Sequence, residues 1–265
     1  MAAATGKVII VTGASRGIGL AISHHLLSSS CSPNSASQNN RILAIARSRG
    51  PLEQLQREYP SRVEILAGDL SDFSLGAKVA EVVKDKFGGR LDGLIVNHGI
   101  LEPVKRVADA DAEEWRRLFD VNFFSAVSMI KACLPQLRAS KGRIVLCSSG
   151  AASNNYATWG AYGASKAALN HLAGTLATEE KHVTTISVRP GVVDTDMQVS
   201  IRDTHSTEMD KTDAAKFLEL KQTGGLLRPD QPGNVMAKLS LDAPAELSGK
   251  FLSWNDASLA AFQEK

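Results

Sequence analysis

The sequence has little cysteine, and none of it is paired. Cys31, Cys133 and Cys147 are the three cysteines, and no two of them form a C-x-x-C motif. A disulfide framework needs more cysteines at closer spacing, and a zinc site needs ligand pairs a few residues apart. The sequence therefore predicts neither a disulfide framework nor a metal ion, and it favours a reducing compartment, with the cytoplasm as the expected location.

Charge of one sign and long apolar runs are also missing. The formal net charge is +2, and Lys and Arg are spread along the chain rather than gathered in runs, so nothing indicates a nucleic-acid partner. No window holds the roughly 18 apolar residues that cross a membrane. Residues 1–6 lack the features of a signal peptide, and residues 263–265 match no peroxisomal signal. We expect no membrane partner.

What the sequence does contain is an alternation of short β-branched runs and longer helical patterns. Runs such as VIIVT and ILAIA are apolar throughout, which is typical of parallel strands covered by helices on both faces. Hydrophobic residues make up 43% of the chain, enough for one large core. The prediction is a single α/β domain over residues 1–265 with a doubly wound, seven-stranded parallel sheet. Its strands are expected at Lys7–Thr12, Arg41–Ala46, Val63–Ala67, Gly93–Asn97, Gly142–Ser148, Thr184–Arg189 and Phe251–Trp254.

Two segments interrupt this pattern. Residues 28–40 (SSSCSPNSASQNN) are small and polar, which predicts a mobile surface loop inserted between the first helix and the second strand. Residues 196–230 are irregular, with a possible helix at Asp213–Thr223 and a Gly-Gly pair after it. A long segment of this kind after a strand is typical of a lid over an active site.

A glycine-rich turn, Thr12–Gly19, joins the first strand to a helical pattern. Glycines let the backbone turn sharply and approach a diphosphate, and the helix that follows offers unpaired N–H groups to it. A tight turn without any ligand is the alternative, and the strand before and helix after make it less favoured. A P-loop is excluded, because no Lys-Ser/Thr pair follows the glycines.

The end of the second strand indicates which dinucleotide is preferred. Arg47 and Ser48 stand there in place of an acid that would bind a ribose 2′-hydroxyl, and Arg16 lies within the glycine turn. Both cations fall where a 2′-phosphate would lie, which favours NADP(H) over NAD(H), although each taken singly is as well explained as solvated surface. Asp69 has two open interpretations, a contact to the adenine amino group or a cap on a helix beginning near Ser71.

Tyr162 and Lys166 stand four residues apart in a helical pattern, so their side chains share one face. A neighbouring ammonium lowers the pKa of a phenol, which suits a general acid for carbonyl reduction. Ser149 directly follows the fifth strand, at the carboxyl end of the sheet, where its hydroxyl can polarise a substrate carbonyl. Ser148 is the competing residue, and a local turn or cap is the structural alternative for either serine.

The T-G-x-x-x-G-x-G turn, the Y-x-x-x-K pair and the serine 13 positions before the tyrosine resemble the short-chain dehydrogenase/reductase family from Lys7 to about Trp254. The resemblance implies a Rossmann fold, an oxidoreductase, and Asn122 as a fourth catalytic residue that bends its helix and holds a proton-relaying water for Lys166. It also implies that residues 189–195 meet the nicotinamide. The expected cofactor contacts are Gly13, Ser15, Arg16, Gly17, Ile18, Gly19, Arg47, Ser48, Asp69, Leu70, Asn97, Gly99, Tyr162, Lys166, Pro190, Gly191, Val193 and Thr195.

His98 departs from the family pattern, which usually has Ala between Asn97 and Gly99. It either reaches the cofactor or packs against the fifth strand, and packing is favoured.

Within the family, the chain resembles the fungal-type benzil reductases, relatives of sepiapterin reductase, in Leu101–Val104, Trp159–His171 and Val193–Gln198. The resemblance implies reduction of a ketone, or of one carbonyl of a 1,2-diketone to a 2-hydroxyketone, as well as a homodimer or homotetramer formed through the helices around 115–137 and 161–180. The pocket walls are expected at 102–104, at 151–159 and in the lid that begins at Asp196, with Tyr156, Trp159 and Met197 offering apolar surface. Two rival functions remain, a non-catalytic NADP(H)-sensing regulator and an NAD-dependent secondary-alcohol dehydrogenase.

Overall fold

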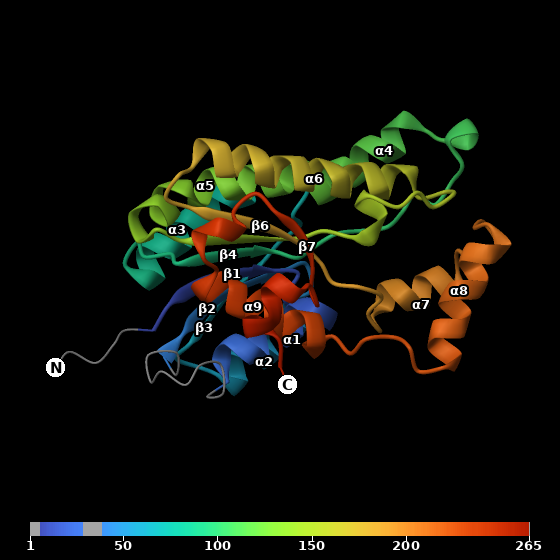
Figure 1. Cartoon of the computed structure of the whole chain (residues 1–265). Helices are drawn as coiled ribbons and strands as arrows, with labels where there is room; N and C mark the ends of the chain where they lie inside the picture. The colour runs from blue at the N-terminus through green and yellow to red at the C-terminus, as the bar shows by residue number, and fades with distance from the viewer. Residues whose placement is uncertain (1–5, 29–38, 265) are drawn as a thin grey trace.

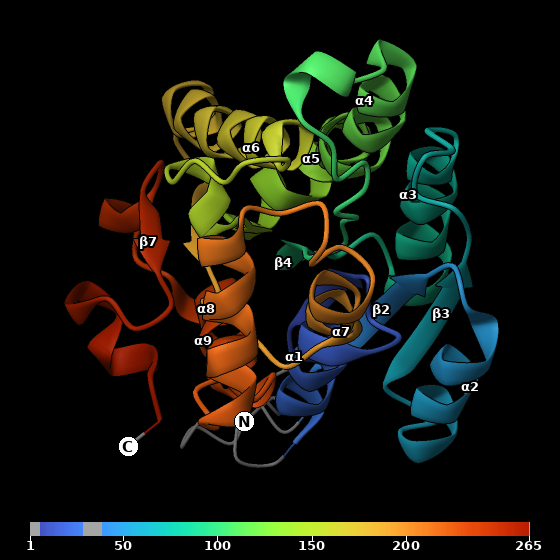
Figure 2. The same cartoon turned by 90° about the vertical axis from the view of Figure 1, so that its right-hand side faces the viewer.

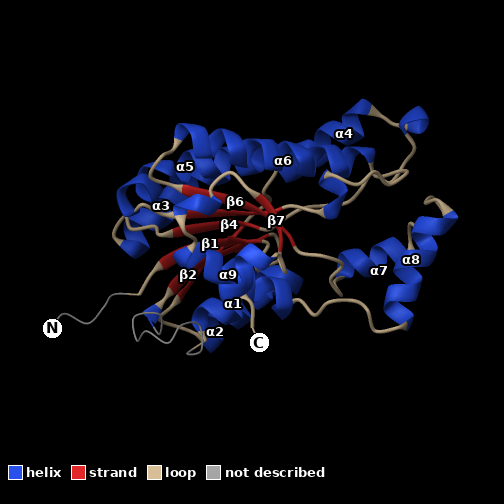
Figure 3. Cartoon of the chain, viewed as in Figure 1, coloured by secondary structure: helices blue, strands red, loops and turns tan. Residues whose placement is uncertain are grey.

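One parallel sheet organises the described residues, 6–28 and 39–264 of a computed structural model. Within them the sheet has seven strands in the order β3-β2-β1-β4-β5-β6-β7 (Figures 1 and 3). The predicted strands and the doubly wound fold are confirmed, with ends that differ by one residue at several strands. The strands are β1 (Val8–Thr12), β2 (Arg41–Ala46), β3 (Val63–Ala67), β4 (Gly93–Val96), β5 (Arg143–Cys147), β6 (Thr184–Arg189) and β7 (Phe251–Ser253).

The central strands are buried on both faces because their runs are apolar at every position. All five residues of β1 and five of the six in β2 are buried, as expected for parallel strands between two helical layers. The chain crosses from β1 to β2 and β3 on one side and returns to β4 on the other. This reversal opens a crevice at the carboxyl ends of the strands, where α/β sheets of this kind bind ligands.

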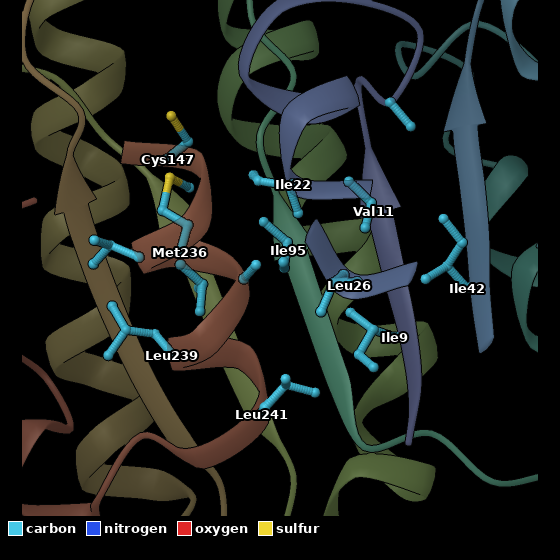
Figure 4. Packing of buried hydrophobic residues seen from close by; sticks show 14 of the residues in the cluster. Ile9, Val11, Ile22, Leu26, Ile42, Ile95, Cys147, Met236, Leu239 and Leu241 are labelled. Atoms are coloured by element: carbon cyan, nitrogen blue, oxygen red, sulfur yellow. The ribbon is translucent and has the colours of Figure 1, made fainter. Parts of the chain in front are cut away.

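Two layers of helices enclose the sheet (Figure 1). One core lies between the sheet and α1, α2 and α9, where Ile9, Leu26 and Leu239 are fully buried (Figure 4). The other core lies under α3, α5 and α6. The helices are α1 (Gly17–Leu27), α2 (Arg49–Glu58), α3 (Leu75–Phe87), α4 (Ala112–Phe119), α5 (Ser125–Ser140), α6 (Gly160–Glu179), α7 (Asp196–Asp203), α8 (Lys211–Gln222) and α9 (Asp230–Asp242).

A π-helix, η3 (Asp120–Phe124), joins α4 to α5, so residues 112–140 form one continuous helical run. By length and composition alone this run is long and apolar enough to cross a membrane, which the sequence analysis did not expect. Its apolar side chains nevertheless serve the core, since Met129, Ile130 and Leu137 are buried against the sheet layer. The core helix of a globular domain can have the same length and composition, so this run alone is not evidence for a membrane span.

The α7–α8 segment (residues 196–230) extends beyond the carboxyl ends of the strands and faces the viewer in Figure 2. Its base is closed by backbone hydrogen bonds from Asp194 N to Leu227 O (2.8 Å) and from Leu227 N to Val192 O (2.9 Å). The predicted helix at 213–223 is present and begins two residues earlier, at Lys211. For the other irregular segment, the predicted loop at 28–40, residues 29–38 lie outside the described residues, as does Cys31.

The glycine turn gives the first testable prediction. A Cβ built on Gly19 would lie 2.1 Å from Gly13 O and 2.6 Å from Asn97 Nδ2, so Gly19→Ala must force α1 away from β1. We expect the free energy of unfolding to fall by about 1–3 kcal/mol, the usual cost of overpacking, in denaturant titrations. Gly50→Ala is the matched control in the first turn of α2, where a Cβ meets nothing within 4 Å. Equal stability of the two variants would contradict this account of the turn.

Candidate active site

The glycine turn has the geometry that a diphosphate requires. Gly13 and Gly17 adopt positive φ values of 68° and 53°, which glycine tolerates and other residues rarely do. Asn97 fixes the turn from β4, since its Nδ2 donates to Thr12 O at 3.2 Å. At the start of α1, Arg16 is the N-cap residue and its side chain makes no capping hydrogen bond. The first N–H groups of this helix are therefore suited to an anionic ligand.

The two predicted phosphate-binding cations border the same cleft as the glycine turn. Arg16 pairs with Asp196, the first residue of α7, and both side chains are well exposed. Arg47 lies close enough to Asp69 that its charge contributes to lowering the pKa of that carboxyl, although hydrogen bonds from Ser71 are the larger cause. These positions are compatible with a phosphate on the ribose of a dinucleotide.

Asp69 makes a local turn. Its Oδ1 accepts hydrogen bonds from Ser71 N and Ser71 Oγ, both at 2.9 Å. The interpretation that it caps a helix beginning near Ser71 is wrong, because α3 begins only at Leu75. Its other interpretation, a contact to adenine, stays a prediction, and Asp69 does line the cleft.

Tyr162 and Lys166 lie one turn apart on α6, and both are buried. Lys166 Nζ donates to Cys147 O, the last residue of β5, at 2.8 Å. The same Nζ lies 5.8 Å from the centroid of the Tyr162 ring. The strand end therefore fixes the ammonium beside the phenol, with the two groups facing one cleft.

Burial dominates the acidity of this pair. It raises the pKa of Tyr162 to about 12, while a hydrogen bond with the Ser149 side chain acts in the opposite direction. Burial also lowers the pKa of Lys166. The expected lowering of the Tyr162 pKa does not hold: desolvation of the phenolate raises this pKa, and the group that acts against it is Ser149 rather than Lys166. At neutral pH the phenol keeps its proton.

Ser149 and Ser148 have different partners although they are adjacent. Ser149 is hydrogen bonded to Tyr162 and also accepts from Ala151 N at 3.1 Å. Ser148 Oγ donates to Lys166 O at 3.4 Å, on the backbone of α6. Ser149 is thus the serine that shares a hydrogen bond with the phenol, as the sequence interpretation preferred, and it also makes the local turn contact that was the alternative.

Asn122 lies in the π-helix and is completely buried. Its Oδ1 accepts from Ile100 N (2.8 Å) and its Nδ2 donates to Ile100 O (2.9 Å) and to Ser165 Oγ (3.2 Å). The helix is distorted at Asn122, as the resemblance implied. A Cβ on Gly99 would lie 3.3 Å from both Asn122 Oδ1 and Lys166 Nζ, so Gly99 separates these two side chains.

His98 is a buried link between the glycine turn and the π-helix. Its Nδ1 lies 2.7 Å from Thr12 Oγ1, and its Nε2 lies 2.7 Å from Ser125 Oγ and 3.0 Å from Val121 O. His98 is buried, but these hydrogen bonds run to β1, the π-helix and α5 rather than to β5, against which it was expected to pack. The other interpretation, a contact to the cofactor, stays a prediction, and His98 does line the cleft. Burial, with a smaller effect of Lys166, lowers the pKa of His98 to about 3.

A single cleft of about 1160 Å³ connects these features. The cleft is lined by every predicted cofactor and catalytic residue except Gly19 and Asn122. These two residues contact lining residues instead: Gly19 lies against Gly13, and Asn122 accepts a hydrogen bond from Ile100 N. The chain also contributes lining residues that sequence reasoning missed. The carboxyl-end rule could have found them, because they lie at the ends of β5 and β7. The missed residues include Cys147, Ser253, Trp254 and Asn255, whereas Lys216 and Phe217 belong to the lid that was expected to form a wall.

One predicted wall is wrong. Residues 102–104 do not line the cleft, whereas Leu101 does. Glu102 instead faces the α7–α8 segment, with His205 Nε2 at 3.2 Å and Ser200 Oγ at 3.4 Å from its Oε1. The expected Tyr156, Trp159 and Met197 do line it.

The geometry agrees with comparisons to known proteins. Residues 7–206 match the family model described as short chain dehydrogenase. A benzil reductase ((S)-benzoin forming) of Saccharomyces cerevisiae is 41% identical over 97% of this chain and 99% of its own length. A solved short chain dehydrogenase/reductase of the same yeast is 41% identical, covers 98% of this chain and 100% of its own, and has a TM-score of 0.92. A yeast structure described as a cytoplasmic protein with unknown function is 40% identical over 98% of this chain and 100% of its own, with a TM-score of 0.78.

The link through His98 predicts a pH dependence of stability. The unfolded chain binds a proton at His98 near the ordinary pKa of 6.5, and the folded chain binds it only near 3. The stabilising contribution is therefore complete above about pH 6.5 and is lost as the pH falls toward 3. We expect the unfolding temperature to drop more steeply below neutral pH in the wild type than in His98→Gln.

Thermal unfolding from neutral pH down to about pH 4 measures this difference. The control is His182→Gln, which removes an exposed histidine and should reproduce the wild-type slope. Parallel curves for the wild type and His98→Gln would refute the assigned cause.

Proposed function

Because the chain belongs to the short-chain dehydrogenase family and is an oxidoreductase of the type that uses NAD(P)(H), we propose that it is an NADP(H)-dependent carbonyl reductase. Its substrate is a ketone, or a 1,2-diketone of the benzil type that is reduced to a 2-hydroxyketone. The observation that carries this proposal is the protonated Tyr162 phenol, hydrogen bonded to Ser149 and backed by Lys166, in a cleft that also contains the glycine turn. The benzil reductase among the relatives supports the substrate class.

The residues around the cleft fit a dinucleotide. Gly13, Ser15, Gly17 and Ile18 offer backbone to the diphosphate, and Arg47 offers a bidentate contact to a 2′-phosphate. The contacts expected from the family resemblance complete this set; they are Ser48, Asp69, Leu70, Asn97, Gly99, Pro190, Gly191, Val193 and Thr195, all bordering the same cleft. When bound, the cofactor supplies the hydride.

The chain's own groups perform the proton chemistry. Ser149 Oγ donates a hydrogen bond to the substrate oxygen and stabilises the negative charge that develops there. Tyr162 Oη gives its proton to that oxygen. Lys166, whose Nζ donates to Cys147 O, would hold the nicotinamide ribose and return a proton to Tyr162, and Asn122, fixed by its hydrogen bonds to Ile100, would relay a proton to Lys166.

Other features of the proposal concern the whole molecule. We propose that residues 1–265 act as one cofactor-binding domain, with the α7–α8 segment as a lid. We also propose a cytoplasmic location, in keeping with the yeast neighbour described as cytoplasmic, and a homodimer or homotetramer formed through α4, α5 and α6. No metal and no nucleic-acid or membrane partner is part of the proposal.

Removing the phenol hydroxyl tests the catalytic assignment. Tyr162→Phe deletes the proton donor and should lower kcat for benzil by roughly 10²–10⁴-fold, followed by consumption of NADPH. The matched control is Tyr156→Phe. Tyr156 also lines the cleft, but its hydroxyl contacts Lys216 Nζ at 3.3 Å, and its loss should change kcat less than about threefold. Full activity in Tyr162→Phe would refute the mechanism.

A second substitution tests cofactor preference. Arg47→Ala should raise KM for NADPH by roughly 10–100-fold, because it removes a charge-assisted contact to the 2′-phosphate, and should leave KM for NADH unchanged. Arg49→Ala is the control, since Arg49 is engaged with Glu53 at 2.7 Å on α2. A wild-type preference for NADH, or an equal effect of Arg47→Ala on both cofactors, would overturn the NADP(H) assignment.

A further inference from the structure

The cleft contains a buried polar atom that has no partner. Among the described residues, Trp159 Nε1 belongs to the small set of buried side-chain nitrogen and oxygen atoms without a hydrogen bond, and Trp159 is the member of that set that lines the cleft. A buried donor left unpaired costs about 1–3 kcal/mol. An indole N–H in a ligand cleft with no acceptor of its own therefore indicates an acceptor on the ligand.

The backbone is strained where it positions this indole. Thr158 has a φ of 72°, an unfavourable conformation for a β-branched residue. Its carbonyl accepts a hydrogen bond from Lys105 N at 3.1 Å, which holds the strained residue in place. Trp159 follows directly as the N-cap of α6, three residues before Tyr162. Strain that is maintained in this way is concentrated at functional sites.

The indole stands beside the proposed proton donor. Its ring is perpendicular to that of Tyr162, with the centroids 5.9 Å apart. On its other sides lie Tyr156, at 4.8 Å, and Phe217 of α8, stacked at 5.5 Å and 18°. These rings make the wall next to the catalytic phenol aromatic, so it suits a flat aryl group.

A vicinal diketone presents two oxygens to this wall. Tyr162 and Ser149 serve the carbonyl that is reduced, and the second oxygen, on the adjacent carbon, remains an acceptor before and after the reaction. We infer that Trp159 Nε1 donates to the second carbonyl oxygen and so determines specificity for 1,2-dicarbonyl substrates, an inference that rests on the proposed function.

Access to Nε1 requires an aromatic ring to move. The atom is closed off from solvent, so the side chains that enclose it must shift. Phe217, stacked on one face of the indole, is the ring whose place a substrate could take. Phe217 is also the one residue of α8 that is buried, so displacing it releases a single anchor of that helix. A substrate aryl ring can take its place against the indole and restore the stacking, which points to aryl 1,2-diketones.

Two substrates that differ by one oxygen test the inference. Benzil and deoxybenzoin carry the same two phenyl rings, but deoxybenzoin has only one carbonyl. Trp159→Phe keeps an aromatic ring and removes the N–H. We expect kcat/KM for benzil to fall about tenfold, equivalent to about 1.4 kcal/mol, with less than a threefold change for deoxybenzoin. Trp159→His, which retains a ring N–H, should keep the wild-type ratio of the two substrates, and it also serves if Trp159→Phe does not fold.

Trp115→Phe is the matched control, because Trp115 packs against the same cluster beside Gly160 without lining the cleft; its substrate ratio should equal that of the wild type. The inference would be overturned if Trp159→Phe lost kcat/KM equally for benzil and deoxybenzoin, or lost none for benzil. It would also be overturned if Trp159→His failed to keep the wild-type ratio of kcat/KM for the two substrates. Wild-type reduction of deoxybenzoin without reduction of benzil would overturn it and leave the carbonyl reductase standing. Failure of the wild type to reduce any carbonyl compound would refute the proposed function and the inference with it.

Discussion

The parallel pairing of β1 with β4 and of β4 with β5 is the constraint on which the cleft depends. Ile9 pairs with Gly93, and Gly93 with Arg143, so the three strands run in register and end at one edge. Each strand end then delivers one part of the site: the glycine turn after Thr12, Asn97 after β4, and the Cys147 carbonyl at the end of β5. Residues more than a hundred positions apart meet because parallel strands place all of their carboxyl ends at the same edge of the sheet.

Buried hydrogen bonds convert this alignment into a rigid site. Thr12 Oγ1 donates to Ile95 O at 3.2 Å and contacts His98, which in turn contacts Ser125 beside the π-helix. From the π-helix, Asn122 binds the backbone of Ile100 through both the oxygen and the nitrogen of its side-chain amide, and Gly99 leaves space for Lys166. A buried polar group is costly to leave unpaired, so each of these hydrogen bonds fixes the position of the side chain or backbone group that it joins. The cofactor end and the catalytic end are therefore parts of one network.

The sequence predicted what depends on local pattern and missed what depends on packing. The strands, the glycine turn and the Tyr162–Lys166 spacing follow from periodicity and from residue types that have few alternatives. The direction of the Tyr162 pKa does not, because it is a balance between desolvation and charge that only the folded surroundings decide. The lid was expected to form a wall of the pocket, but the packing of its residue Phe217 was not predicted, for the same reason. A phenylalanine in an isolated helix gives no sign of which surface it will cover, and here it covers Trp159.

Burial of Tyr162 bears on the proton that the proposed reaction needs. Oxidation of an alcohol needs a phenolate to accept the proton, and burial makes that phenolate costly by raising the pKa to about 12. Reduction of a carbonyl needs the phenol, which burial maintains at neutral pH and which Ser149 orients by a hydrogen bond. A buried, protonated tyrosine beside a lysine whose own pKa is lowered can give up a proton as negative charge develops on the substrate oxygen. In the proposed reduction, the interior that stabilises the fold thus also keeps the proton on the group that is to donate it, whereas alcohol oxidation would first have to remove that proton.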